Sequence, residues 1–141
     1  MATFNKVNVF VENLAEKVHN LGSDTLKIAL TNTAPTASSA TMSDITQISS
    51  GNGYTSGGTQ ATISSSAQSS GTYKLVLADV VFTAAGGSIG PFRYAVLYND
   101  TPTSPADPLI GYWDYGSSVT LADTETFTVD FDGTTGVMTL A

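Results

Sequence analysis

Short segments in which apolar and polar residues alternate recur along this sequence, separated by turn signals about every 8–12 residues. The alternation is explicit in Leu26–Leu30 and in Glu125–Phe131, where the phenylalanines and the valine are expected to face inward. The segment Phe92–Tyr98 is apolar on both faces apart from one arginine, which predicts a central strand covered on both sides. We therefore expect a mainly β, jelly-roll-like sandwich of about eight strands.

The composition favours many short strands around one core. Hydrophobic residues make up 41% of the 141 residues and charged residues only 12%, about half the usual share. Serine, threonine, asparagine and glycine fill the polar positions, and these residues suit half-exposed strands and the turns between them. We expect a single domain over residues 1–141, with the sandwich occupying about residues 25–141.

The N-terminal segment has a helical periodicity. Its apolar residues recur at the spacing of one helix face; they are Val7, Phe10, Val11, Leu14, Val18 and Leu21. The pattern predicts a helix over about residues 5–21, ended by Gly22 as a left-handed cap. The alternation of three valines over residues 7–11 leaves a strand as an alternative. An amphipathic helix must pack against something, so Val7, Phe10, Val11 and Leu14 contact either the chain's own sandwich or a partner.

Two clusters of turn residues separate predicted strands. Asparagine or aspartate followed by glycine favours a tight turn, because both residues tolerate a positive φ. The residues to which we assign a turn role are Asn52, Gly53, Gly57 and Gly58 in the first cluster and Asp132 and Gly133 in the second. The second cluster should open a hairpin loop before the last strand.

The alternation changes phase once inside the longest strand-like run, Thr72–Thr83. The apolar residues up to Leu77 fall on one face, whereas Val80 and Phe82 fall on the other. A bulge near Ala78-Asp79 would reconcile the two halves, because bulges occur where a sheet bends.

Three aromatic residues, Tyr112, Trp113 and Tyr115, lie close together in a predicted strand. Alternation places Trp113 and Tyr115 on one face and Tyr112 on the other. Such rings fill cores and subunit interfaces, and they also form the platforms on which carbohydrate-binding sandwiches stack sugars. Both interpretations stay open, and the three residues are candidates for an interaction surface.

The residues that could support catalysis lack the sequence context that catalysis requires. Ser88 lies in a G-x-S-x-G pattern, but Pro91 and a predicted strand follow it where a nucleophile elbow needs a helix. His19 is the single histidine and has no triad spacing around it, so we expect it to face solvent or a neighbouring loop. Asp130 and Asp132 share a strand face, but a solvated sheet edge explains them without a metal. We expect neither an enzyme nor a cofactor or metal site.

The charge and the cysteine content restrict the kinds of partner and the cellular compartment that we expect. The formal net charge is −7 and the five basic residues are scattered, whereas nucleic-acid binding needs a basic patch. No apolar run approaches membrane-spanning length, and the N-terminus lacks the pattern of a signal peptide. The absence of cysteine favours folding in a reducing cytoplasm. We therefore expect neither a nucleic-acid nor a membrane partner.

Four stretches of the chain resemble those of small virion structural proteins of tailed bacteriophages, and the similarity covers nearly the whole chain. The stretches are Glu16–Lys27, Gly51–Gly58, Arg93–Asp100 and Pro108–Ser118. Some members of this group resemble head-decoration or cement proteins. The group offers no catalytic motif whose residues could be carried over to this chain.

The resemblance implies a non-enzymatic particle component: a capsid decoration or cement protein that oligomerises and stabilises the head shell. The expected partners are the major capsid protein and further copies of the chain itself. The expected location is the capsid surface of the virion, after assembly in the cytoplasm of the bacterial host. The alternative is a tail, fibre or baseplate component with a receptor- or glycan-binding face, in which Tyr112, Trp113 and Tyr115 would form a sugar platform.

Overall fold

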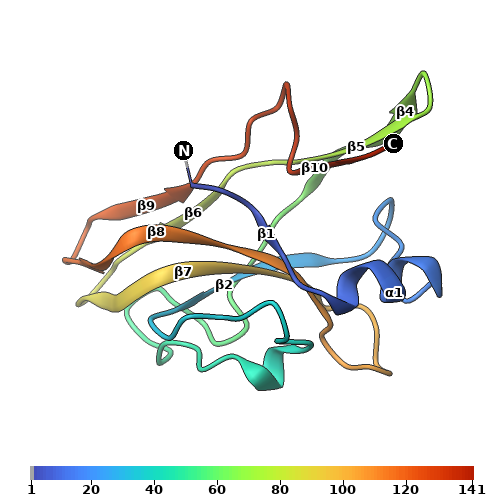
Figure 1. Ribbon diagram of the computed structural model, residues 1–141. Coiled ribbons are helices and arrows are strands. Elements are labelled where there is room, and N and C mark those ends of the chain that lie inside the picture. The colour runs from blue at the N-terminus through green and yellow to red at the C-terminus, as the bar shows by residue number, and fades with distance from the viewer. Residues whose placement is uncertain (1) are drawn as a thin grey trace.

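The computed structural model describes residues 2–141, in which ten strands, one α-helix and one short 3-10 helix are formed (Figure 1). The strands are β1 (Asn5–Lys6), β2 (Leu26–Thr31), β3 (Thr59–Gln60), β4 (Ile63–Ser69), β5 (Thr72–Leu77), β6 (Val80–Thr83), β7 (Ile89–Asn99), β8 (Leu109–Leu121), β9 (Thr126–Val129) and β10 (Met138–Leu140). The helix α1 spans Val9–Ala15, and the 3-10 helix spans Met42–Asp44.

The strands form two layers with the core between them. The first layer is a five-stranded antiparallel sheet in the order β1-β8-β7-β2-β3. The second layer consists of two smaller antiparallel sheets, β10-β5-β4 and β6-β9, which lie end to end over the first layer in Figure 1. Helix α1 lies at one end of the large sheet and contacts β8 (Figure 1).

Strand β7 is the centre of the large sheet, because β2 and β8 pair with it on either side. Val96 lies opposite Ala29 of β2 and Tyr112 of β8. Val96 and its neighbour Leu97 point to opposite faces of the sheet, and both are fully buried. The sheet is therefore covered on both faces here, which confirms the central strand predicted from the apolar run Phe92–Tyr98.

The phase change between β5 and β6 marks a change of sheet. β5 ends at Leu77, paired with β4 and β10, and β6 begins at Val80, paired with β9. Ala78 and Asp79 between them belong to neither sheet, and Asp79 Oδ1 accepts a hydrogen bond of 2.9 Å from the backbone N–H of Phe131. The predicted bulge at these two residues is wrong: the chain crosses there from one small sheet to the other, which splits the second layer.

The helix is shorter than the predicted range of residues 5–21. Lys17 adopts a left-handed conformation with a φ of 68°, and the N–H of Val18 donates to the carbonyl oxygen of Asn13 at 2.8 Å. This is the hydrogen bond of a Schellman ending, so Gly22 does not cap the helix. The strand alternative for residues 7–11 is wrong, because Val9 and Val11 lie in the helix and the short strand β1 ends at Lys6, before the first of the three valines.

The first predicted turn cluster does form turns. Asn52 and Gly53 have φ values of 54° and 101°, and the flanking Gly51 and Tyr54 exchange backbone hydrogen bonds of 2.8 and 3.0 Å. Gly58 has a φ of 74° and lies so close to β2 that an added Cβ would overlap a carbonyl group of that strand. Glycine is required at this position by both backbone conformation and space.

The other predicted turn residues also lie in turns. Gly57 has a φ of 95° and donates its N–H to the side chain of Gln47. Near the C-terminus, Asp132 Oδ1 accepts the backbone N–H groups of Thr134 and Thr135 at 2.7 and 3.2 Å, an Asx turn that encloses Gly133. The predicted hairpin at this turn is wrong, because β9 pairs with β6 and β10 pairs with β5, so the loop joins two different sheets.

The prediction of a mainly β sandwich with one N-terminal helix is confirmed. The core is one continuous cluster between and around the layers. Its largest fully buried side chains include Phe10, Phe92, Leu26, Ile28, Leu30, Leu75, Leu97 and Ile110. Within residues 2–141, no helix has the length and apolar character needed to cross a membrane.

Candidate functional site: an aromatic cleft

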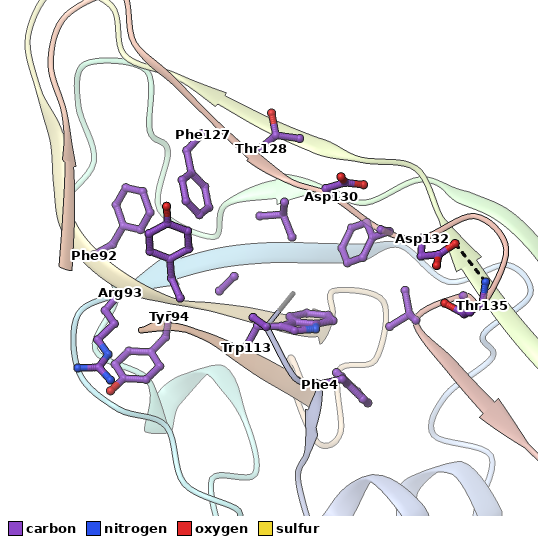
Figure 2. A pocket seen from close by; sticks show the side chains of 17 residues that line it. Phe4, Phe92, Arg93, Tyr94, Trp113, Phe127, Thr128, Asp130, Asp132 and Thr135 are labelled. Carbon is purple, nitrogen blue, oxygen red and sulfur yellow. Dashed lines mark hydrogen bonds between the residues drawn. The ribbon is translucent and has the colours of Figure 1, made fainter. Parts of the chain in front are cut away.

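Three strands and the N-terminal segment bring six aromatic rings, besides Tyr94 at its border, to one cleft between the layers, which we call the aromatic cleft (Figure 2). The rings are Phe4 before β1, Phe92 on β7, Trp113 and Tyr115 on β8, Phe127 on β9 and Phe131 after β9. Alternation along β8 and β9 explains the grouping, because residues two apart on a strand share a face. The lining includes residues 127–132 and 135–137, at the end of β9 and in the loop toward β10, and Figure 1 shows the course of this loop.

One half of the aromatic cleft is built around Trp113. Its ring centroid lies 5.0 Å from that of Phe4 in a tilted contact and 5.6 Å from that of Phe131 in an edge contact. Aromatic pairs of this kind stabilise by about 0.5–1.5 kcal/mol each beyond the burial of area. Trp113 is half-buried, so its ring is a fixed part of the wall rather than a free stacking surface.

The other half is built around Phe127. Its ring makes edge contacts with Phe92, at a centroid distance of 4.9 Å, and with Tyr115, at 5.3 Å. Phe92 is buried, whereas Tyr115 is 57% exposed. Tyr115 is therefore the ring of the cleft that is most open to a partner, and the half-buried Phe127, which packs on the buried Phe92, supports it from behind.

The aromatic cleft has a volume of about 440 Å³, which lies within the range of ligand pockets. Its walls are apolar, and Thr128, Asp130 and Asp132 lie at its upper edge in Figure 2. The backbone N–H groups of Thr134 and Thr135 donate to Asp132 and hold the pKa of its carboxyl group below the usual value. This carboxylate is therefore ionised at neutral pH, which gives the rim a negative group.

Arg93, at one end of the cleft, is already paired. Its Nε and Nη2 atoms donate to the two carboxylate oxygens of Asp114 at 2.7 and 2.9 Å, and this contact lowers the pKa of Asp114. Figure 2 shows the side chains of Arg93 and Tyr94 pointing away from the rings. The guanidinium is therefore engaged outside the cleft and does not neutralise the rim.

The structure brings two of the three predicted strand aromatics together. Trp113 and Tyr115 both line the cleft, as alternation predicts. Tyr112 lies on the other face of β8, where it is half-buried and its backbone pairs with Asn5 of β1. The three rings do not form one platform.

Of the four N-terminal residues predicted as an interaction surface, two are buried and two are accessible. Val7 and Phe10 are buried in the core of their own domain, and the N–H of Val7 donates to the carbonyl oxygen of Ile110 on β8. Their assignment to a contact surface is therefore wrong, because the sandwich itself covers them. Val11 is 51% exposed and Leu14 is half-buried, so these two remain accessible.

A buried polar network follows the helix. Asn99 Nδ2 donates to His19 Nδ1 at 3.1 Å and to Asp24 Oδ2 at 2.6 Å. Because His19 Nδ1 accepts, the hydrogen bond assigns the imidazole proton to Nε2, which has no partner within residues 2–141. Burial lowers the pKa of His19 to about 4, and the charge of Asp24 opposes this shift. The expectation that His19 faces solvent is wrong, since it is only 5% exposed.

The residues considered for catalysis stay apart. Ser88 lies in the exposed turn before β7, where its carbonyl oxygen accepts from Asn52 Nδ2 at 2.9 Å. This turn and the segment after α1 that holds His19 lie at opposite ends of the molecule (Figure 1). Asp130 and Asp132 lie on the rim, and within residues 2–141 no three histidine, cysteine or acidic side chains gather closely enough to hold a metal ion.

The sequence predicted the facing direction of four of the six rings. Alternation predicted that Phe127 and Phe131 face inward together, and that Trp113 and Tyr115 share a face. It did not join the two pairs into one cleft, and it did not include Phe4. Phe4 carries no periodic signal because β1 has only two residues.

Comparison with known proteins yields no relative: no protein-family model, no curated protein and no solved structure matches the chain.

Proposed function

We propose that this chain is a non-enzymatic structural protein of bacteriophage particles, a capsid decoration or cement protein that self-associates and stabilises the head shell. The observation that carries the proposal is the aromatic cleft, a preformed apolar recess whose outermost ring, Tyr115, is 57% exposed. The sequence resemblance to small virion structural proteins supports the same class. The expected partners are the major capsid protein and other copies of the chain.

The cleft has the character of a protein contact site. Tyrosine, tryptophan and phenylalanine are enriched at interfaces, and the residues that dominate binding fill well-packed pockets surrounded by weaker contacts. Here the buried Phe92 and the half-buried Phe127 hold Tyr115 in place. A partner that covers Tyr115 would therefore gain apolar burial without first ordering the ring.

The remaining surface suits attachment in many copies. Only 12% of residues are charged, so most of the surface can approach a shell with little charge desolvation. A decoration protein needs only a modest contact, on the order of 800 Å² per partner, at each site. Self-association then adds avidity across the lattice without new contacts to the shell.

A tail, fibre or baseplate protein with a glycan-binding face is the second candidate, favoured by Tyr115 and by the carboxylates of Asp130 and Asp132, which line the same cleft. Aromatic rings stack on sugars, and carboxylates accept hydrogen bonds from sugar hydroxyl groups. The packing of Trp113 against Phe4 and Phe131 weakens this candidate, because the largest ring is engaged within the wall. We therefore place the shell contact first.

Co-sedimentation of the purified protein with capsids that lack it tests the proposal. We expect saturable binding at a stoichiometry that matches the symmetry of the shell, and improved resistance of the particles to heat and osmotic shock. Tyr115→Ala should weaken binding by roughly tenfold or more if the cleft is the contact. Val81→Ala is a matched control, because Val81 is also a large exposed apolar residue, at 51%, on β6 outside the cleft.

The two candidates give different results in the same set of measurements. Labelled protein found only on tails, together with no binding to stripped capsids, would reject the decoration role. Binding on a glycan array that Tyr115→Ala abolishes would support the second candidate. Shell binding that is equally strong in both alanine variants would place the contact elsewhere on the surface.

A further inference from the structure

Strand β4 presents an open edge. It pairs with β5 on one side only, in the order β10-β5-β4, and the hairpin that it forms with β5 projects from the body of the molecule in Figure 1. Within β4, Ser65, Ala67, Gln68 and Ser69 are exposed. An edge strand leaves every second pair of backbone N–H and C=O groups free for another strand.

This edge lacks the features by which proteins usually protect an exposed strand. Natural edge strands carry a charged residue or a proline, are very short, or twist away at a bulge. β4 has seven residues, IleSerSerSerAlaGlnSer in sequence, without a charge or a proline. Its one irregularity lies between Ile63 and Ser65, so the five residues from Ser65 to Ser69 are regular and unprotected.

The edge is also suited to a second copy of itself. In an antiparallel pair centred on Ala67, Ser65 faces Ser69 of the other copy and Ser66 faces Gln68, so every opposed pair is small or polar and uncharged. The rest of the chain carries a net charge of −7, which disfavours contact between two copies elsewhere. A neutral edge is where that repulsion is weakest.

The charged residue of the neighbouring strand β5 is compatible with pairing. Lys74 lies opposite Ala67 on β5, and its Nζ atom donates to the carbonyl oxygen of Thr134, on the side away from the edge. Across a paired edge, the two Lys74 residues would be three strand spacings apart, about 14 Å. This distance exceeds the Debye length at physiological ionic strength, so their repulsion is screened.

We propose that two copies of this chain pair antiparallel through β4, centred on Ala67, to form a continuous sheet in the order β10-β5-β4-β4-β5-β10. The inference rests on the self-association part of the proposed function and supplies its surface. It does not involve the aromatic cleft or the shell, so it is tested on the purified protein alone.

The absence of cysteine makes crosslinking a direct test. At the centre of the pair, the two copies of residue 67 bring their Cβ atoms about 4.5–5.5 Å apart, close to disulfide geometry. Under mild oxidation, Ala67→Cys should form a covalent dimer. Ser38→Cys, at an exposed serine in the loop after β2, should stay monomeric at the same concentration. A mixture of Ser65→Cys and Ser69→Cys should crosslink, whereas Ser65→Cys alone should not.

Charge placed at the same position provides a second test. Ala67→Glu opposes two carboxylates across the pair, while within its own chain the new carboxylate faces Lys74, so loss of pairing cannot be attributed to a weakened hairpin. Sedimentation equilibrium should show self-association of the natural chain and of Ala67→Thr, and its loss in Ala67→Glu. The inference is overturned if Ala67→Cys crosslinks no faster than Ser38→Cys, or if Ala67→Glu and Ala67→Thr associate equally. Failure here with intact shell binding would leave the decoration role standing.

Discussion

Acidification should destabilise this protein through His19. The imidazole is buried, and its Nδ1 atom accepts a hydrogen bond of 3.1 Å from Asn99, which also donates to Asp24. Protonation gives the imidazole a second N–H group, at Nδ1, where it faces the N–H of Asn99, and it places a charge in a buried site. The segment after α1 is joined to the end of β7 through this network, so its loss should loosen the N-terminal part of the fold.

The size of the effect follows from the pKa difference. The folded-state pKa of His19 is about 4, whereas the ordinary value is 6.5, so the unfolded chain binds the proton more tightly. The contribution of His19 is fully present above about pH 6.5 and is lost as the pH falls toward 4. The two pKa values correspond to about 3 kcal/mol of unfolding free energy over this window.

Other titrating groups act outside this window or in the opposite direction. The carboxyl groups of Asp44 and Asp132 have pKa values below the usual 3.8, so their contribution is lost only at lower pH. Burial raises the pKa of Asp107, and its protonation in the folded state partly offsets the loss at His19. The natural chain should therefore lose somewhat less than His19 contributes.

A variant isolates the contribution of His19. Asparagine can accept the hydrogen bond from Asn99 through its Oδ1 atom but does not titrate. His19→Asn should therefore have a lower free energy of unfolding than the natural chain at neutral pH, and this free energy should change less as the pH falls. The assay is denaturant unfolding followed by Trp113 fluorescence between about pH 7.5 and about pH 4.5, with the midpoint and slope fitted at each pH. Asp44→Asn is the control, because its effect should be confined to lower pH. Equal pH dependence in the natural chain and in His19→Asn would refute the reasoning.

Three further predictions concern stability and are checked by the same unfolding assay at neutral pH. Gly58→Ala should lower the free energy of unfolding by about 2 kcal/mol or more, because the φ of Gly58 is 74° and an added Cβ would overlap the backbone of β2. Gly71→Ala is the matched comparison: its φ is 83° but the space around it is open, so the loss should be about 1 kcal/mol. Tyr54→Phe should cost about 1–3 kcal/mol, because the hydroxyl accepts the buried N–H of Leu30 at 3.1 Å. Phe92→Ala should cost about 3–5 kcal/mol, because it empties a buried site and releases one wall of the aromatic cleft. Equal midpoints for the two glycine variants, or changes below about 0.5 kcal/mol in the other two, would contradict these assignments.

The sequence predicts a strand best at the centre of a sheet, where another strand pairs with it on each side. Phe92–Tyr98 is apolar at successive positions, and the only β environment that buries both faces is the centre of a covered sheet. The phase change at Ala78-Asp79 is equally visible in the sequence, but a bulge and a change of sheet produce the same shift in parity. The two are distinguished by which strand pairs on each side, and pairing between distant segments leaves no local signal.

The length of the helix could not be read from the apolar stripe for a related reason. Val18 and Leu21 continue the spacing of a helix face, but both follow the turn at Lys17, after which Leu21 reaches the core and Val18 is only half-buried. A lysine in the left-handed conformation is uncommon, and Gly22 offered a more favourable end. His19 was misplaced for the same reason, since its burial depends on Asn99, which lies 80 residues away in the chain.

The split of the second layer explains why the aromatic cleft is open. Asp79, in the crossing between β5 and β6, binds the N–H of Phe131, and so holds the chain after β9 beside the break instead of letting it continue in one ladder. The loop from Asp130 to Val137 then arches over to β10, and the rings beneath it lack a continuous sheet above them. The free edge of β4 has a separate cause, because β4 pairs with β5 alone and no strand lies on its other side. A second layer that continued without a break from β9 to β10 would cover the rings but would leave this edge open, so the two surfaces can be removed independently by substitution.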